Sequence, residues 1–83
     1  MNRQEMRTSV LDSLADIAPG EDLSTVAANA DLREALDIDS MDFLRFVVLL
    51  HDRLHVDIPE KDYAKLRTLD GCIEYLAAKV APA

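Results

Sequence analysis

Apolar residues recur at helical spacing in three long stretches of this chain. In residues 2–17 they return every four positions from Met6 to Leu14, which places them on one face of a helix. Residues 40–54 are apolar around most of the helical circumference, as expected of a helix with a broad buried face. The positions predicted to form that face are Phe43, Leu44, Phe46, Val47, Leu50 and Leu54. A further amphipathic helix is predicted over 69–80.

The connection between the first two helices is long for a compact domain. It runs over residues 18–38 and begins with Pro19-Gly20, which ends the first helix. Its own apolar positions indicate that it packs across the bundle; they are Leu23, Val26, Leu32 and Leu36. Asp31 precedes Glu34 at the spacing of a capping box, which predicts a short helical turn over 31–36.

A short helix is predicted between the second and last long helices. Pro59 suits its first position, where a missing N–H does no harm, so the helix is placed over 59–66. The sequence therefore predicts an all-α protein, a four-helix bundle with a long first loop and a short third helix. The 83 residues leave room for one domain, 1–83.

Composition excludes several classes of function. The formal charge of −7 argues against nucleic acid, which requires a basic surface, and favours basic protein partners. No apolar run exceeds Phe46 to Leu50, so we expect no membrane insertion. The start of the chain lacks the apolar core of a secretion signal. A single cysteine allows no internal disulfide, and we expect a cytoplasmic protein.

One serine stands where an acidic loop becomes an apolar helix. Asp39 is placed to cap the helix, and Ser40 is then its first residue. Ile38 and Phe43 flank this start at the spacing of a hydrophobic staple. Free N–H groups and the helix dipole both favour an anionic substituent on that hydroxyl. Serine is also common at helix starts, so this pattern alone leaves an ordinary cap open.

The segment around Ser40 resembles the attachment motif of a known family. Asp39-Ser40-Met41 is similar to the Asp-Ser-Leu motif of acyl carrier proteins, with Met41 in place of leucine. Val56-Asp57-Ile58-Pro59 matches the segment that follows the second helix in that family. Thr68-Leu69-Asp70 and Tyr75-Leu76 resemble the start and the aromatic-aliphatic pair of its last helix. The match is continuous in order and spacing from Asp31 to Val80.

The resemblance implies a function for the whole chain. A phosphopantetheinyl transferase would move 4′-phosphopantetheine from coenzyme A onto Ser40, and the thiol of that arm would hold acyl groups as thioesters. The protein would be a monomeric carrier that serves acyl-loading, elongating or acyl-transferring enzymes, with a fatty or related acyl cargo. We do not expect an enzyme, because no His, Lys or Cys lies within the same turn to activate Ser40.

Family members hold the acyl chain in a cavity between their last three helices. The apolar residues that the resemblance places around such a cavity are Val47, Leu50, Leu54, Ile58, Leu66, Leu69 and Leu76. An ordinary packed core accounts for the same residues, because a full and a loosely packed bundle share this composition.

The outer stripe of the helix over 40–54 is the docking face that the family implies. The residues assigned to it are Asp39, Met41, Asp42, Arg45, Val48 and Asp52. Met41 and Val48 are expected to be partly exposed there. Arg45 and His51 occupy positions where common carriers have glutamate, which predicts a specialised carrier with its own partner enzymes.

Other readings of the chain remain open or weak. His51 and His55 lie four residues apart, but a metal site needs further ligands, so we expect solvated side chains and no metal. Cys72 fits a small buried hydrophobe, and Gly71 fits a close helix contact. The alternatives for function are a peptidyl or polyketide carrier, or a non-catalytic interaction module in which Ser40 is never modified.

Overall fold

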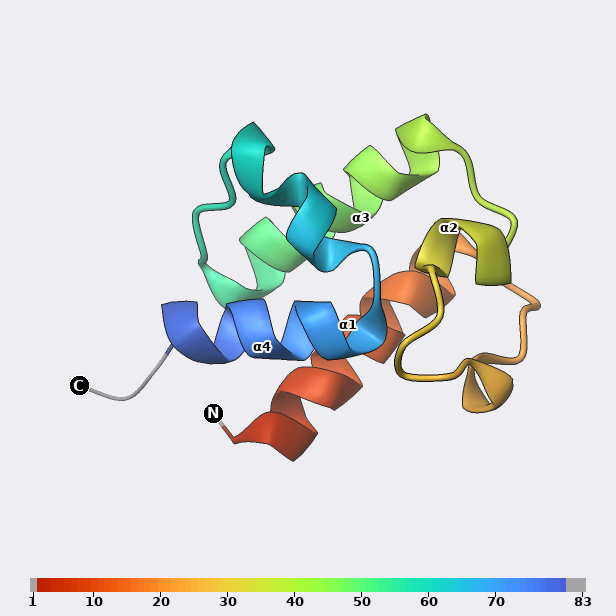
Figure 1. Cartoon of the computed structure of the whole chain (residues 1–83), viewed down its shortest axis with the longest axis horizontal. Coiled ribbons are helices and arrows are strands. Elements are labelled where there is room, and N and C mark those ends of the chain that lie inside the picture. Colours follow the sequence, from red (N-terminus) through yellow and green to blue (C-terminus); the bar gives the residue numbers. More distant parts are fainter. Residues whose placement is uncertain (1, 81–83) are drawn as a thin grey trace.

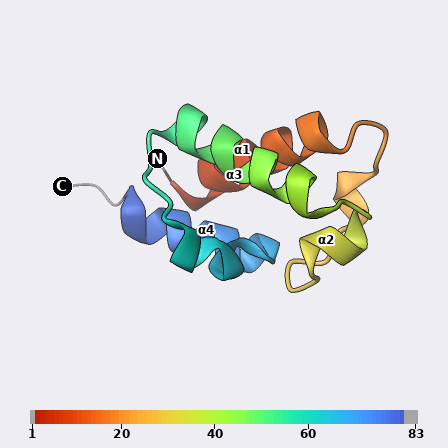
Figure 2. The same ribbon diagram turned by 90° about the horizontal axis from the view of Figure 1, so that it is seen from above.

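The computed structural model describes residues 2–80, which fold into a small helical bundle (Figure 1). Its elements are α1 (Arg3–Ile17), η1 (Leu23–Thr25), α2 (Leu32–Ala35), α3 (Ser40–Leu54), η2 (Glu60–Leu66) and α4 (Leu69–Lys79), where η marks a 3₁₀ helix. Seen from above, α1 and α3 form one layer, and α4 with η2 forms a second (Figure 2). Residues 2–80 contain no strand, and the predicted all-α bundle is confirmed.

The ends of the helices follow local capping chemistry. Asn2 and Glu5 form a reciprocal capping box at the start of α1, with N–H···O distances of 2.8 and 3.0 Å. Asp31 caps α2, and its Oδ1 accepts the Arg33 N–H at 2.9 Å. Pro59 stands one residue before η2 and not at its first helical position, and the short helix that follows it is a 3₁₀ helix.

The core is aliphatic, with Phe46 as its largest fully buried side chain. One prediction for α3 is wrong: Leu44 is 40% exposed, because it points away from the bundle that the neighbouring Phe43 and Phe46 enter. Leu54 is half-buried and packs against the edge of the core. Gly71 allows a close approach of α4 to η2, because a Cβ at this position would lie 2.3 Å from the Lys65 carbonyl oxygen.

The long connection packs across the bundle, as predicted. Leu32 and Leu36 are buried, and two backbone bonds join this connection to the end of η2 and the start of α4. The Leu32 N–H donates to the Arg67 carbonyl at 2.7 Å, and the Asp70 N–H donates to the Ala28 carbonyl at 2.9 Å. Residues more than thirty positions apart are thereby brought next to each other.

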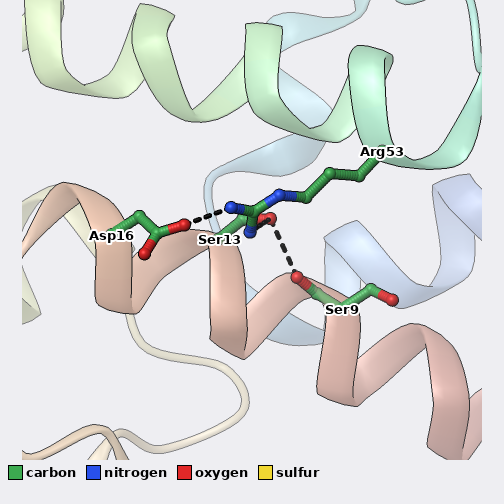
Figure 3. Close-up of polar contacts among 4 residues, drawn as sticks. All are labelled: Ser9, Ser13, Asp16 and Arg53. Carbon is green, nitrogen blue, oxygen red and sulfur yellow. Dashed lines mark hydrogen bonds and ion pairs between the residues drawn. The ribbon is translucent and has the colours of Figure 1, made fainter.

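Arg53 holds the C-terminal end of α3 against α1 (Figure 3). Its guanidinium pairs with the Asp16 carboxylate and donates to the Ser13 hydroxyl at 3.1 Å. Ser13 is fully buried and in turn donates to the Ser9 carbonyl at 2.9 Å. This contact satisfies a buried hydroxyl and fixes the position of α3, whose other end begins with Ser40.

Candidate functional site

Ser40 is exposed at the first position of α3. Asp39 caps this helix as predicted: its Oδ1 accepts the Asp42 N–H at 2.8 Å, and its carbonyl accepts the Phe43 N–H at 3.0 Å. The N–H groups of Ser40 and Met41 precede the first intrahelical bond and are left for another acceptor. An exposed hydroxyl at the positive end of a 15-residue helix is a suitable place for a phosphate ester.

The loop before Ser40 is held in one conformation. Ile38 is buried, and its N–H donates to the Arg33 carbonyl at 3.1 Å. Asp37 adopts a left-handed backbone conformation with φ of 52°, which Asp tolerates better than most residues. Phe43, on the other side of the helix start, is also buried. Two buried anchors therefore flank the exposed serine and fix the angle at which the loop enters α3.

Two open pockets lie along the side of α3 that faces η2. The first, of about 390 Å³, is next to the serine, and its lining includes Arg33, Ser40, Phe43, Tyr63 and Arg67. The second, of about 570 Å³, lies towards the C-terminal end of α3 and is lined by Val47, Val48, His51, Asp57, Ile58, Pro59, Tyr63 and Lys79. Tyr63 lines both pockets, so its side chain stands between them.

Only some of the residues that were predicted to line an acyl cavity line these pockets. Val47 and Ile58 line the larger one. Leu50, Leu66, Leu69 and Leu76 lie fully buried in the packed core and line neither of the two. Tyr63, which lines both pockets, was not among the predicted cavity residues. It lies three residues before the fully buried Leu66 on η2, and this spacing is the signal that could have found it.

The predicted docking face carries an exposed apolar ridge. Met41 is 66% exposed and Val48 is 50% exposed, as expected, and Leu44 joins them. These three residues line a shallow groove of about 320 Å³ together with Ile17, Arg45 and Leu49. Arg45 lies 3.5 Å from the Asp42 carboxylate in an exposed ion pair, and Asp52 is exposed.

A buried hydrogen bond attaches η2 to α4. The Tyr75 hydroxyl donates to Asp62 Oδ2 at 2.7 Å, and Lys65 lies 3.5 Å from the same carboxylate. The bond from Tyr75, assisted by the positive charge of Lys65, lowers the pKa of Asp62. Burial, reinforced by the Asp62 charge, raises the pKa of Tyr75 to about 12. Near neutral pH the donor is therefore protonated and the acceptor is charged, which holds η2 beside the pockets.

The histidines and the cysteine are engaged in local structure. His51 Nδ1 lies 2.8 Å from the Val56 carbonyl oxygen and donates to it, while His55 ends α3 with a left-handed φ of 54°. Within residues 2–80 no group of three or more His, Cys, Asp or Glu side chains is placed to hold a metal ion. Cys72 is buried, donates to the Leu66 carbonyl at 3.3 Å, and has a pKa raised to about 12 by desolvation, so its thiol is unreactive.

Helices in the described part of the chain are too short or too polar to cross a membrane.

Comparison with known proteins agrees with this geometry. The family described as "Phosphopantetheine attachment site" matches residues 9–76. The acyl carrier protein of Rubrobacter xylanophilus is 29% identical over 76 residues, which cover 92% of this chain and 93% of that protein. The acyl carrier protein of Thermosynechococcus vestitus is 30% identical over 81 residues, which cover 98% and 99%. That of Chlamydia felis is 33% identical over 60 residues, which cover 72% and 77%.

The chain therefore belongs to the acyl carrier protein family, whose members bear a phosphopantetheine attachment site. Its prosthetic group is covalently attached 4′-phosphopantetheine, and the protein is a carrier and not an enzyme. The residues present fit this group, because the exposed Ser40 hydroxyl stands at a capped helix start with two N–H groups left for a phosphate.

Proposed function

We propose that Ser40 is the attachment residue and that the protein carries acyl intermediates for enzymes of fatty acid or specialised lipid biosynthesis. The observation that carries this proposal is the exposed hydroxyl at the first position of α3, inside the matched region 9–76. The arm supplies a thiol on which an acyl group is held as a thioester. We place the protein in the cytoplasm, where its single cysteine, Cys72, remains a free thiol.

Attachment depends on a second protein for its chemistry. Ser40 Oγ attacks the phosphorus next to the pantetheine of coenzyme A, the pyrophosphate P–O bond breaks, and adenosine 3′,5′-bisphosphate leaves. The hydroxyl proton must pass to a base, and no His, Lys or Cys lies within the same turn as Ser40. The phosphopantetheinyl transferase must therefore supply that base. This chain contributes an exposed hydroxyl at a helix start that is flanked by the buried Ile38 and Phe43.

The test is to incubate the protein with coenzyme A and a broad-specificity phosphopantetheinyl transferase, and to measure the intact mass. We expect a single phosphopantetheinyl gain, which mass mapping of proteolytic fragments assigns to Ser40. An unchanged mass would contradict the proposal and would favour an interaction module with an unmodified serine. Thioesters recovered on protein from native cells would distinguish fatty acyl cargo from aminoacyl or polyketide cargo.

We assign the acyl chain to the larger pocket, reached from the one beside Ser40 past Tyr63. Val47 and Ile58 give this pocket apolar walls, while His51, Asp57 and Lys79 keep its edge polar. Each methylene removed from water is worth about 0.8 kcal/mol at most. An acyl chain of several methylenes should therefore displace water from this pocket.

The acyl chain is expected to stabilise the bundle. Loading with octanoyl should raise the melting temperature above that of the free-thiol form, because the chain binds only the folded state. Thermal unfolding followed by circular dichroism measures this, and the acetyl-loaded protein is the matched control, with little apolar surface to bury. Equal melting temperatures for the free-thiol and octanoyl forms would contradict the assignment.

We further propose that the apolar ridge on α3 contacts partner enzymes and that Arg45 selects among them. Met41, Leu44 and Val48 supply exposed apolar contacts, and Arg45 lies in the same groove. A basic residue here meets a basic partner surface unfavourably, which changes partner choice and association rate. Asp39, Asp42 and Asp52 complete the proposed docking face and retain the acidic character that suits a basic partner.

Charge reversal at Arg45 tests this selection. Arg45→Glu is expected to raise elongation by the housekeeping fatty acid synthase enzymes of a generic bacterial host, because it restores the usual acidic contact. The measurement is the rate of acyl extension on the loaded carrier. Arg7→Glu, an exposed change on α1, provides the same change in charge away from α3 and should have little effect. Full activity of the unaltered protein with those enzymes would refute a specialised partner.

A further inference from the structure

Two arginines line the pocket that contains Ser40. Arg33 comes from α2 and Arg67 follows η2, and the packing of the long connection against residue 67 brings them to one pocket. Within residues 2–80 the Arg33 guanidinium forms no ion pair and no hydrogen bond. Arg67 pairs with Asp31 through Nη2, but its Nε is buried without any hydrogen-bond partner. Both side chains therefore retain unused donors.

An unused buried donor is unusual in a native protein. Removing an N–H group from water without giving it an acceptor destabilises the folded state, so the hydrogen bonding of the Arg67 side chain is incomplete, while the side chain as a whole remains 42% exposed. Arg presents its donors in a planar fork that matches the oxygens of phosphate. The Arg67 Nε is the single buried side-chain polar atom without a partner in the described chain, and it belongs to a residue of this pocket.

The charged side chains that line the pocket are more positive than negative, and the carboxylates of Asp31 and Asp39 lie next to that lining. Arg33 and Arg67 contribute two positive charges to its lining, against the single carboxylate of Glu60. Asp31 offsets part of the Arg67 charge from outside the lining. The remaining lining is largely apolar, with Phe43, Leu44 and Tyr63 among its members. The free N–H groups at the start of α3 add to the positive electrostatic potential beside Ser40.

Because Ser40 lines this pocket, a phosphodiester attached to its oxygen would lie at the pocket. We propose that Arg33 and Arg67 bind the phosphodiester of the phosphopantetheine arm and so direct the arm from its first atoms into the groove between α3 and η2, towards Tyr63. This inference rests on Ser40 being the attachment residue. A carboxylate at the far end of an acyl cargo has the same chemistry, but it lies a full arm length away from Ser40 unless the arm folds back.

Nuclear magnetic resonance tests the contact directly. Intact mass first shows that each sample is fully loaded, so a failure of attachment is separated from a failure of the arginine contact. In the wild-type protein, conversion from the unmodified to the phosphopantetheinyl form should shift the Arg67 Nε–H signal and slow its exchange with water several-fold. The Arg45 Nε–H signal should not change, because Arg45 lines a different groove.

Glutamine variants test the mobility of the phosphodiester. In loaded Arg33→Gln and Arg67→Gln, the ³¹P signal should narrow towards that of the unfolded loaded protein, whereas Arg45→Gln should match the wild type. Arg67→Gln also removes the pairing with Asp31, so circular dichroism must show that it still folds. Arg33→Gln gives a clear result even if Arg67→Gln does not fold, because within residues 2–80 the Arg33 guanidinium forms no ion pair that the substitution would break.

A change of acyl cargo shows whether the arginines bind the phosphodiester or a carboxylate on the cargo. Acetyl-loaded and succinyl-loaded protein should both give the Arg67 signal of the free-thiol form. A shift that occurs only with succinyl would overturn the phosphodiester assignment in favour of a cargo carboxylate. Loaded protein with an unchanged Arg67 signal, together with wild-type ³¹P mobility in Arg33→Gln, would overturn the arginine contact altogether.

Discussion

Alanine at position 40 is expected to abolish loading completely. The Ser40→Ala variant should keep its unmodified mass after incubation with coenzyme A and a phosphopantetheinyl transferase, because it lacks the oxygen that forms the ester. Its fold should be retained: Ser40 is exposed, and the cap of α3 comes from Asp39. Circular dichroism should therefore match the wild type, with a change in stability within about 0.5 kcal/mol. Intact mass spectrometry gives the result.

Ser24→Ala is the matched control for this experiment. Ser24 is another exposed serine near the start of a helical segment, and its hydroxyl donates to the Asp22 side chain at 2.6 Å. It lies on a three-residue 3₁₀ turn without the free N–H groups of a long helix start. The control should load fully. Any phosphopantetheinyl gain in Ser40→Ala would show that attachment occurs elsewhere and would remove the basis of the proposed function.

The position of Ser40 could be predicted because its signals are local. Asp39 and the apolar pair around the helix start, Ile38 and Phe43, lie within five residues, and the start of α3 depends on little else. Capping and stapling are short-range effects that survive in almost any tertiary context. The exposure of Met41 and Val48 followed from the same helix register.

The surroundings of the serine could not be predicted, because they depend on contacts between distant residues. Arg33 and Arg67 share a pocket because the backbone bond from Leu32 to Arg67 and the Arg67–Asp31 ion pair join their segments, and the sequence has no short-range signal for either contact. The 3₁₀ form of η2 is likewise set by tertiary packing. Gly71 lets α4 approach the Lys65 carbonyl, and Tyr75 holds Asp62. The placement of Tyr63 between two pockets follows from that form.

The hydrophobic pattern near the start of α3 does not predict which apolar residues are buried. The helix is apolar around most of its circumference, so the pattern assigned Leu44 to the same buried face as Phe46. In the structure Phe46 is fully buried and Leu44 is 40% exposed. Two apolar residues of one helix therefore have different roles, one in folding and the other on the proposed docking face.

Phe46→Ala is expected to destabilise the protein by about 3–5 kcal/mol, because it leaves a cavity that the surrounding side chains fill only in part. A domain of this size has roughly 4–12 kcal/mol of stability in total. Each lost kcal/mol lowers the melting temperature of a small domain by about 4–8 °C. The variant should therefore be largely unfolded well below the melting temperature of the wild type, as measured by thermal and urea unfolding.

Leu44→Ala is the control on the same helix, two residues earlier, with the same chemical class of side chain. It should destabilise the protein by only about 1 kcal/mol, because a side chain that is 40% exposed gives up much less buried area than Phe46 when it is truncated. The difference between the two variants mainly measures burial, because replacing Leu or Phe by alanine changes helix propensity by less than about 0.7 kcal/mol. Equal destabilisation would mean that Leu44 is a core residue, and the apolar ridge proposed for partner enzymes would lose its central member.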